Sequence, residues 1–190
     1  MTARLWWVRH GPTHASGMVG WSDVAADLSD AAALGRLAAV LPREAAVVSS
    51  DLGRAVTTAD AIADGRPRLP HDPDLREINF GTWEMRRHDE ITGDEAQLIR
   101  RFWDEPGEVT APEGESWNDV CRRVSAAADR LATRGGEIVA VAHMGAILTQ
   151  VQRATGFDGY RTFGQPIANL SVTTIVFDGS WRMESVNRSP

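Results

Sequence analysis

The residues most capable of chemistry follow two apolar runs of the sequence. Arg9 and His10 come directly after the run 5–8, and His143 comes directly after the run 138–142. A neutral imidazole is a competent nucleophile at phosphorus when an acceptor holds its second ring nitrogen. A guanidinium binds a phosphate dianion through its planar fork of donors and stays charged at any working pH. These residue types therefore indicate phosphoryl chemistry, with Arg9 as a phosphate ligand and one histidine as the attacking group.

Two further candidates are Arg54 and Glu77. Arg54 follows the apolar run 45–48 and two serines, and the apolar spacing after it predicts that it lies in the first turn of a helix. The start of a helix favours an anion through its free N–H groups and its dipole. Glu77 lies in a segment with glycine and aromatic residues, which predicts a structured loop. Its carboxyl group is the candidate proton donor to the departing alkoxide, while the arginines and the second histidine would stabilise the moving charge.

The elements that must position these residues form an α/β pattern. The runs 5–8, 45–48 and 138–142 predict buried strands of a mostly parallel sheet. Asp178-Gly179 separates two alternating runs and predicts a hairpin, so the sheet should end in an antiparallel pair. Ligands of open α/β sheets bind at the carboxyl ends of the strands, where the candidates should meet. Helices are predicted over 31–41, 54–63 and 117–133 and from residue 146.

The composition excludes several classes of function. The chain has 190 residues, a net charge of −6 and one cysteine, Cys121. This charge argues against a nucleic-acid partner and against attraction to acidic membrane surfaces. No cysteine and histidine spacing suggests a metal site, and no segment reaches the ~20 apolar residues of a membrane span or forms a signal peptide. We therefore expect a cytoplasmic protein without metal or other cofactor.

Short motifs spread along nearly the whole chain carry a resemblance to a known family. They are Arg9-His10-Gly11 with Thr13, Ser49-Ser50-Asp51-Leu52-x-Arg54-Ala55-x-x-Thr58-Ala59, Leu75-x-Glu77-x-x-x-Gly81-x-Trp83-Glu84, Glu113-Gly114-Glu115-Ser116 and Val141-Ala142-His143-x-Gly145. Through them the sequence resembles the histidine phosphatase superfamily, in its phosphoglycerate-mutase-like branch. Together these motifs are highly specific.

The resemblance implies a fold and a set of roles. The fold would be three-layer α/β/α, with residues 1–190 forming a single domain. His10 would become phosphorylated, while Arg9, Arg54 and His143 would form the phosphate pocket. Glu77 would be the proton donor, and no metal would be needed. His10, Glu77 and His143 are thus the predicted catalytic residues.

The predicted function is hydrolysis of a small phosphomonoester, of the sugar phosphate or ribazole phosphate type, through a phosphohistidine. One alternative is a phosphoglycerate-type mutase, which would need a larger lid to exclude water. The other is a phospho-ligand binding module that keeps the fold without activity. Residues 84–113 are a candidate lid or specificity element, and within them residues 86–105 are predicted to form one or two helices with a basic face. A homodimer is the candidate assembly.

Residues near the motifs are candidates for contact with the rest of the substrate. The other tryptophans, Trp103 among them, are expected to pack in the core or against helices. The candidate contacts are Thr13, Ser16, Trp21 and Trp83.

Overall fold

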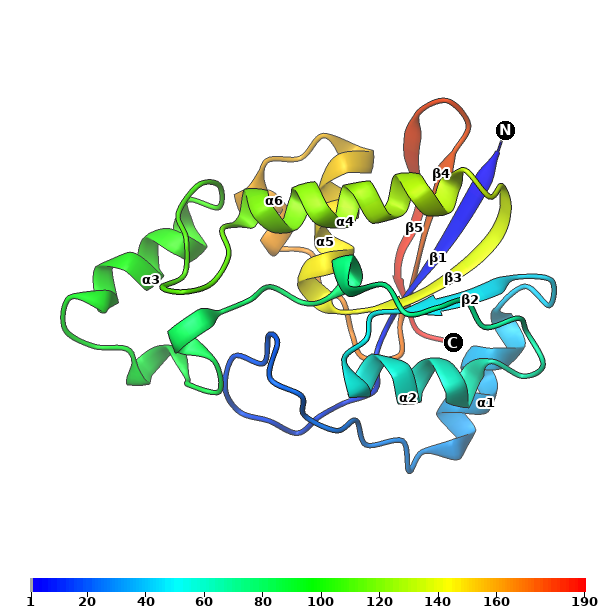
Figure 1. Cartoon of the computed structure of the whole chain (residues 1–190), viewed down its shortest axis with the longest axis horizontal. Coiled ribbons are helices and arrows are strands. Elements are labelled where there is room, and N and C mark those ends of the chain that lie inside the picture. The colour runs from blue at the N-terminus through cyan, green and yellow to red at the C-terminus, as the bar shows by residue number, and fades with distance from the viewer. Residues whose placement is uncertain (1) are drawn as a thin grey trace.

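Figure 1 shows the computed structural model, which describes residues 2–190. No helix in that range is long and apolar enough to cross a bilayer. The strands are β1 (Ala3–Arg9), β2 (Ala46–Ser49), β3 (Gly136–Ala142), β4 (Val172–Phe177) and β5 (Trp181–Arg188). The helices are α1 (Ala31–Val40), α2 (Gly53–Ile62), α3 (Glu95–Asp104), α4 (Trp117–Ala132), α5 (Met144–Thr155) and α6 (Gly159–Phe163).

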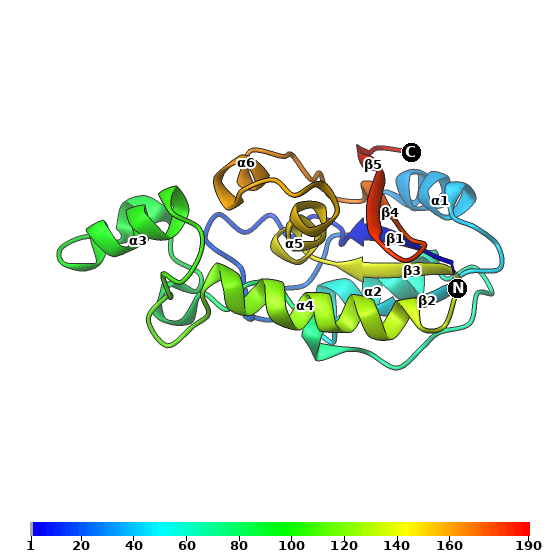
Figure 2. The same ribbon diagram turned by 90° about the horizontal axis from the view of Figure 1, so that it is seen from above.

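The strands form one sheet in the order β2-β3-β1-β4-β5. Strands β2, β3 and β1 are parallel, whereas β4 is antiparallel to β1 and β5 is antiparallel to β4. Asp178 and Gly179 lie in the turn between β4 and β5. The predicted parallel sheet with an antiparallel edge is therefore confirmed, and so is the three-layer α/β/α fold (Figures 1 and 2).

The central strands are buried on both faces because their side chains alternate between two cores. On β1, Leu5 and Trp7 pack into the core that α4 and α5 cover, whereas Val8 packs into the core that α1 and α2 cover. On β3, Ile138 and Val139 divide between the two cores in the same way. Continuous apolar sequence is what such a strand requires. The result is a rigid platform from which the strand ends can present polar groups.

The parallel strands end together and so bring the predicted residues to one edge of the sheet. Arg9 at the end of β1 lies opposite Ala142 at the end of β3. The next residue of each strand, His10 or His143, leaves the sheet at that edge. β2 ends beside them, and Arg54 follows in the first turn of α2. This convergence follows from parallel register alone.

The segment 84–113 extends away from the sheet on the side of this edge (Figures 1 and 2). It contains a 3-10 turn at His88–Glu90 and helix α3. Ile99 and Phe102 of α3 are buried in the core, so the segment is anchored by packing. Its role as a lid stays a prediction. The sequence did not predict α6, because five residues are too few for a periodic pattern.

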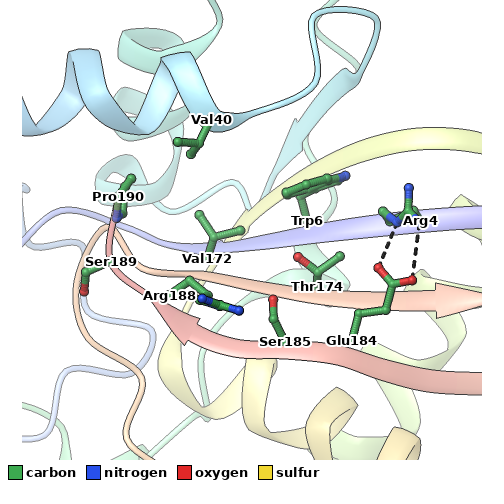
Figure 3. A pocket seen from close by; sticks show the side chains of 10 residues that line it. All are labelled: Arg4, Trp6, Val40, Val172, Thr174, Glu184, Ser185, Arg188, Ser189 and Pro190. Carbon is green, nitrogen blue, oxygen red and sulfur yellow. Dashed lines mark hydrogen bonds and ion pairs between the residues drawn. The ribbon is translucent and has the colours of Figure 1, made fainter.

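A cavity lies over strands β1, β4 and β5, next to α1 (Figure 3). This cavity of about 410 Å³ is bordered by β1, β4, β5 and the last residues of the chain. Trp6 and Thr174 line it, and Val40 of α1 faces it. Its Arg4 is held by two carboxylates, at 3.0 Å from Glu184 and 3.0 Å from Glu137. We call it the β-face cavity.

Candidate active site

A cavity of about 220 Å³ opens where the parallel strands end. Four of the five residues predicted for catalysis or phosphate binding line it, namely Arg9, His10, Arg54 and Glu77. The other lining residues are mainly apolar and come from two loops and from helices α3, α5 and α6. The arrangement combines a charged, buried end with apolar walls. We call it the strand-end cavity.

The ring of His10 is held in one tautomer. Its Nδ1 atom lies 2.6 Å from the carbonyl oxygen of Gly11, which can only accept, so Nδ1 carries the hydrogen. The Nε2 atom is then the free base, and it accepts from Nε of Arg54 at 3.3 Å. Thr58 receives the Gly11 N–H at 3.0 Å, and the side chain of Asn169 donates to the His10 carbonyl at 2.8 Å. Both ring nitrogens and the backbone are thus oriented by neighbours.

His10 also stays neutral over the working pH range. Burial, together with the positive charges of Arg54 and Arg9, lowers the pKa of its imidazole to about 3, although the hydrogen bond to Gly11 opposes this shift. Only 6% of the residue is exposed. A buried neutral imidazole whose lone pair lies beside the guanidinium of Arg54 is suited to attack an electrophile that carries negative charge.

The guanidinium of Arg54 is held by backbone carbonyl groups. It donates to the oxygens of Ser22 at 2.9 Å and Gly20 at 2.6 Å. Burial lowers the pKa of this side chain, and the carboxylates of Glu77, Asp23 and Glu84 act against that shift. No acidic side chain of residues 2–190 is within hydrogen-bond distance of Arg54, so most of its charge is available to an anion.

Glu84 fixes the loop that holds Arg54. Its carboxylate accepts from the backbone N–H groups of Gly20, Trp21, Ser22 and Phe80 at 3.0, 2.8, 3.2 and 3.1 Å. A Cβ atom at position 20 would lie 2.1 Å from the carbonyl oxygen of Ile78, so the loop approaches its neighbour as closely as glycine allows. Glu84 is therefore a positioning residue for the cation.

Arg9 completes the charged end. Its NH1 group donates to the carbonyl of Ile167 at 2.6 Å, whereas its buried Nε has no hydrogen-bond partner within residues 2–190. Burial lowers the pKa of Arg9, and the charge of Glu77 opposes that effect. A buried donor without a partner is costly and rare in native proteins. Such a donor is what a bound anion would satisfy.

Glu77 reaches the start of α5. One carboxylate oxygen accepts from the N–H of Ile78 at 2.9 Å, and the other accepts from the N–H of Gly145 at 3.1 Å. A Cβ atom at position 145 would lie 2.3 Å from the Glu77 carboxylate, which explains the glycine after His143. The helix start and two N–H donors would stabilise the carboxylate after it had given up a proton.

The backbone of Glu77 is clamped from both sides. Its carbonyl oxygen accepts from Nε1 of Trp21 at 2.9 Å and from NH2 of Arg123 at 2.7 Å. Arg123, on α4, is itself fixed by Glu115 at 2.7 and 2.8 Å. This bracing ties the position of the carboxyl group to α4 and to the loop before α1.

His143 lies behind His10, out of the cavity. The two rings are 5.0 Å apart between centroids, and the side chain of His143 is fully buried. Its Nε2 shares a hydrogen bond of 2.6 Å with Oγ of Ser50, and within residues 2–190 its Nδ1 has no partner. Burial, assisted by the neighbouring positive charges, lowers its pKa well below the ordinary value. His143 is thus a neutral ring with one uncommitted nitrogen next to the cavity.

The structure separates the candidate substrate contacts into two groups. Thr13 lines the strand-end cavity, but Ser16 is exposed on the loop and does not line it. Trp21 braces Glu77 through its indole N–H instead of forming a wall. Trp83 does not rim the cavity either. Its indole is fully buried and packs edge-on against Phe102 at 5.6 Å.

Several wall residues were not predicted from the sequence. Trp103, expected to serve only in packing, lines the cavity from α3, and Phe163 lines it from α6. Leu148 and Met144 on α5 contribute as well, as the turn after His143 could have indicated. No sequence signal marks which face of α3 or α6 turns to the site. Those walls depend on the tertiary arrangement.

Comparison with known proteins agrees with this geometry. The sequence model of the histidine phosphatase superfamily (branch 1) matches residues 5–189. This chain belongs to the histidine phosphatase superfamily. The resemblance carried by the motifs is thereby confirmed. Membership in the superfamily places the chain among phosphatases and mutases.

Similar proteins are found among both sequences and structures. A bifunctional protein of Mycobacterium tuberculosis is 31% identical over 204 residues, covering 98% of this chain and 54% of that protein. The chain thus spans about half the length of this curated relative. YhfR of Bacillus stearothermophilus has a TM-score of 0.89 at 28% identity, covering 99% of this chain and 98% of that one. A mycobacterial glucosyl-3-phosphoglycerate phosphatase has a TM-score of 0.81 at 27% identity, covering 100% of both chains. Structural neighbours of this superfamily member therefore include a phosphatase.

Proposed function

We propose that this protein hydrolyses phosphomonoesters through a phosphohistidine formed on Nε2 of His10. The observation that carries the proposal is the fixed tautomer of that ring, whose free nitrogen faces the cavity beside Arg54. Such a nitrogen can attack phosphorus without first losing a proton. The superfamily membership and the phosphatase among the structural neighbours support the same reaction class.

The first step would transfer the phosphoryl group to the protein. Arg9 and Arg54 bind the phosphate oxygens, and the lone pair on Nε2 of His10 forms the N–P bond as the bond from phosphorus to the ester oxygen breaks. The carboxyl group of Glu77, in its protonated form, gives its proton to the leaving oxygen. The alcohol departs, and Glu77 is left as a carboxylate next to two N–H groups. Positioned cations supply most of the stabilisation in such transfers.

The second step would return His10 to its starting state. The Glu77 carboxylate takes a proton from a water molecule, whose oxygen attacks phosphorus while the N–P bond breaks. Phosphate leaves, His10 recovers its lone pair, and Glu77 is protonated again. Water as the acceptor makes the protein a hydrolase acting on a small phosphorylated metabolite, of the sugar phosphate or ribazole phosphate type. A mutase would instead return the phosphoryl group to a reoriented product.

The test is hydrolysis of p-nitrophenyl phosphate by protein treated with EDTA. We expect turnover that ignores the chelator and falls by about 10⁴-fold or more in His10→Ala, because the nucleophile is lost. The control is His88→Ala, at an exposed histidine of the 84–113 segment. It should keep the wild-type rate. Brief reaction with a radiolabelled ester should leave acid-labile, alkali-stable label on the wild type.

Two results would overturn the proposal. Turnover that persists in a folded His10→Ala protein would remove His10 as the nucleophile. Label that moves between positions of a phosphorylated metabolite without release of phosphate would identify a mutase. Circular dichroism on each variant shows whether a lost activity reflects lost folding.

A further inference from the structure

Charge and apolar surface are segregated in the strand-end cavity. The charged residues lie together where the strands end, and the proposed reaction uses each of them on the phosphoryl group or on its leaving oxygen. Beyond them the walls are mainly apolar. Their apolar side chains include Met18, Val19, Phe80, Trp103, Leu148 and Phe163. The part of a substrate that extends past the phosphate would therefore contact hydrocarbon and aromatic rings.

The aromatic part of this wall is one packed unit. The ring of Trp103 lies 5.9 Å from that of Phe80 and 5.3 Å from that of Phe163, the latter nearly edge to face. Phe102 packs against Trp103 from behind, at 5.1 Å. Rings in such arrangements stabilise one another and present a fixed flat surface. A planar or alkyl group can pack on that surface without rearranging it.

A second anionic group on the substrate would find no counter-charge on these walls. Among the described residues that line the cavity, Arg9 and Arg54 are the only cations. Neighbouring arginines are engaged elsewhere: Arg76 donates to Asp51 at 2.6 and 2.5 Å, and Arg86 lies 3.5 Å from Glu95. An unpaired carboxylate or phosphate held against apolar walls loses its hydration without compensation.

We infer that the substrate is a monoester whose alcohol part is uncharged and carries an aromatic or alkyl group. This inference rests on the proposed function and narrows it, because it excludes esters that bear a carboxylate or a second phosphate. It also favours an ester with an aromatic ring over a bare sugar phosphate. An apolar cavity of roughly 150 Å³ takes up one benzene molecule. A volume of about 220 Å³ therefore suits one phosphate and a group of about that size.

The experiment compares benzyl phosphate with 4-carboxybenzyl phosphate. The carboxylate is remote from the reacting atoms, so both esters present the same phosphate and nearly the same leaving alcohol. We expect kcat/KM at least about tenfold higher for benzyl phosphate, because the carboxylate must be desolvated against the apolar wall. Equal values, or a preference for the carboxylated ester, would overturn the inference.

A cation placed on the wall should reduce this preference. Met18→Arg introduces one on the wall of the cavity, and we expect it to lower the ratio of the two kcat/KM values at least about threefold. Met85→Arg is the matched control, because Met85 is half-exposed on an adjacent segment and does not line the cavity. The control should leave the ratio unchanged. A folded Met18→Arg protein with the wild-type ratio would mean that the ester group does not meet this wall.

Binding separates failure of the inference from failure of the proposed reaction. Benzylphosphonate and 4-carboxybenzylphosphonate cannot be hydrolysed, and calorimetry gives their affinities for the wild-type protein. Tighter binding of benzylphosphonate supports the inference even if neither ester is turned over, in which case only the hydrolase proposal fails. Equal or reversed affinities contradict the inference whether or not the protein is a hydrolase.

Discussion

The β-face cavity and the strand-end cavity differ in how their charges are satisfied. In the β-face cavity, the partly exposed Arg4 is neutralised by Glu184, which also lines the cavity, and by Glu137 on the neighbouring strand β3. In the strand-end cavity, Arg54 is held by carbonyl groups and by His10, with no carboxylate within hydrogen-bond distance. Arg9 Nε is buried without a partner among residues 2–190, as is Nδ1 of His143 next to the cavity. The β-face cavity is the larger, at about 410 Å³ against about 220 Å³. Size does not single out the candidate active site, whereas its lining cations without carboxylate partners do.

The strongest way to test this contrast is to neutralise one acid in each cavity. Glu77→Gln should lower kcat for an alkyl phosphate by roughly 10² to 10⁴-fold, because the alkoxide then leaves without a proton. Hydrolysis of p-nitrophenyl phosphate should slow far less, since that leaving group needs little protonation. Glu184→Gln, the matched change in the β-face cavity, should leave both rates unaltered. Steady-state kinetics with the two esters measures all of these values.

Equal slowing of the alkyl and aryl esters by Glu77→Gln would argue against proton donation. It would instead assign Glu77 a purely structural part, through its contacts with Ile78 and Gly145. A large effect of Glu184→Gln on either ester would remove the distinction between the two cavities.

Exchanging an arginine for lysine in each cavity gives the second comparison. Arg54→Lys keeps a positive charge but cannot donate to Gly20 and Ser22 and to a phosphate at once. We expect kcat/KM for p-nitrophenyl phosphate to fall by roughly 10² to 10³-fold, the usual cost of losing a transition-state donor. Arg4→Lys should change it less than about twofold, and should alter stability by no more than about 1 kcal/mol because its ion pairs are partly exposed. Similar losses in both variants would contradict the assignment.

The smallest effect concerns stability at acid pH. The pKa of His10 is lowered to about 3 and that of His143 is also lowered, whereas histidine in an unfolded chain titrates near ~6.5. Below pH ~6.5 the unfolded chain binds more protons than the folded one. As the pH decreases, the free energy of unfolding therefore falls by up to about 1.4 kcal/mol per pH unit for each ring. For His10 this loss ends near its folded pKa of about 3.

Urea denaturation at several pH values between 7 and 5 measures that dependence. His143→Gln should reduce the slope below pH ~6.5 by up to about 1.4 kcal/mol per pH unit. Above that pH, the stability contributed by the neutral ring is fully present. Thr174→Val in the β-face cavity is the control, because neither side chain titrates and the slope should equal that of the wild type. An unchanged slope in His143→Gln would show that the ring titrates in the folded protein as it does in the unfolded chain.

The parts of the site that could be predicted from the sequence are those fixed by strand ends. Arg9, His10 and His143 follow continuous apolar runs, and such runs in a parallel sheet must end at a common edge. Arg54 could be placed with them because it lies in the first turn of the helix that follows a third apolar run, 45–48. The sheet and its antiparallel edge followed from the same patterns and from Asp178-Gly179.

The walls could not be predicted because they depend on which way irregular segments turn. Trp83 and Trp103 both lie in the region between the second and third parallel strands, yet Trp83 points into the core and Trp103 into the cavity. The difference is set by the packing of α3 against Trp83 and Phe80. The same is true of Glu84, which was visible in a motif, but whose four backbone partners lie in a distant loop and a 3-10 turn.

The way Arg54 is held also bears on how the reaction ends. Because its guanidinium is oriented by carbonyl dipoles and by no carboxylate within hydrogen-bond distance, its attraction for an anion does not diminish when the ester has been cleaved. Inorganic phosphate carries the same charged group as the substrate and lacks only the alcohol. On the proposed reaction it is therefore a competitive product inhibitor. The turnover of this protein then depends on the phosphate level around it as well as on the supply of ester.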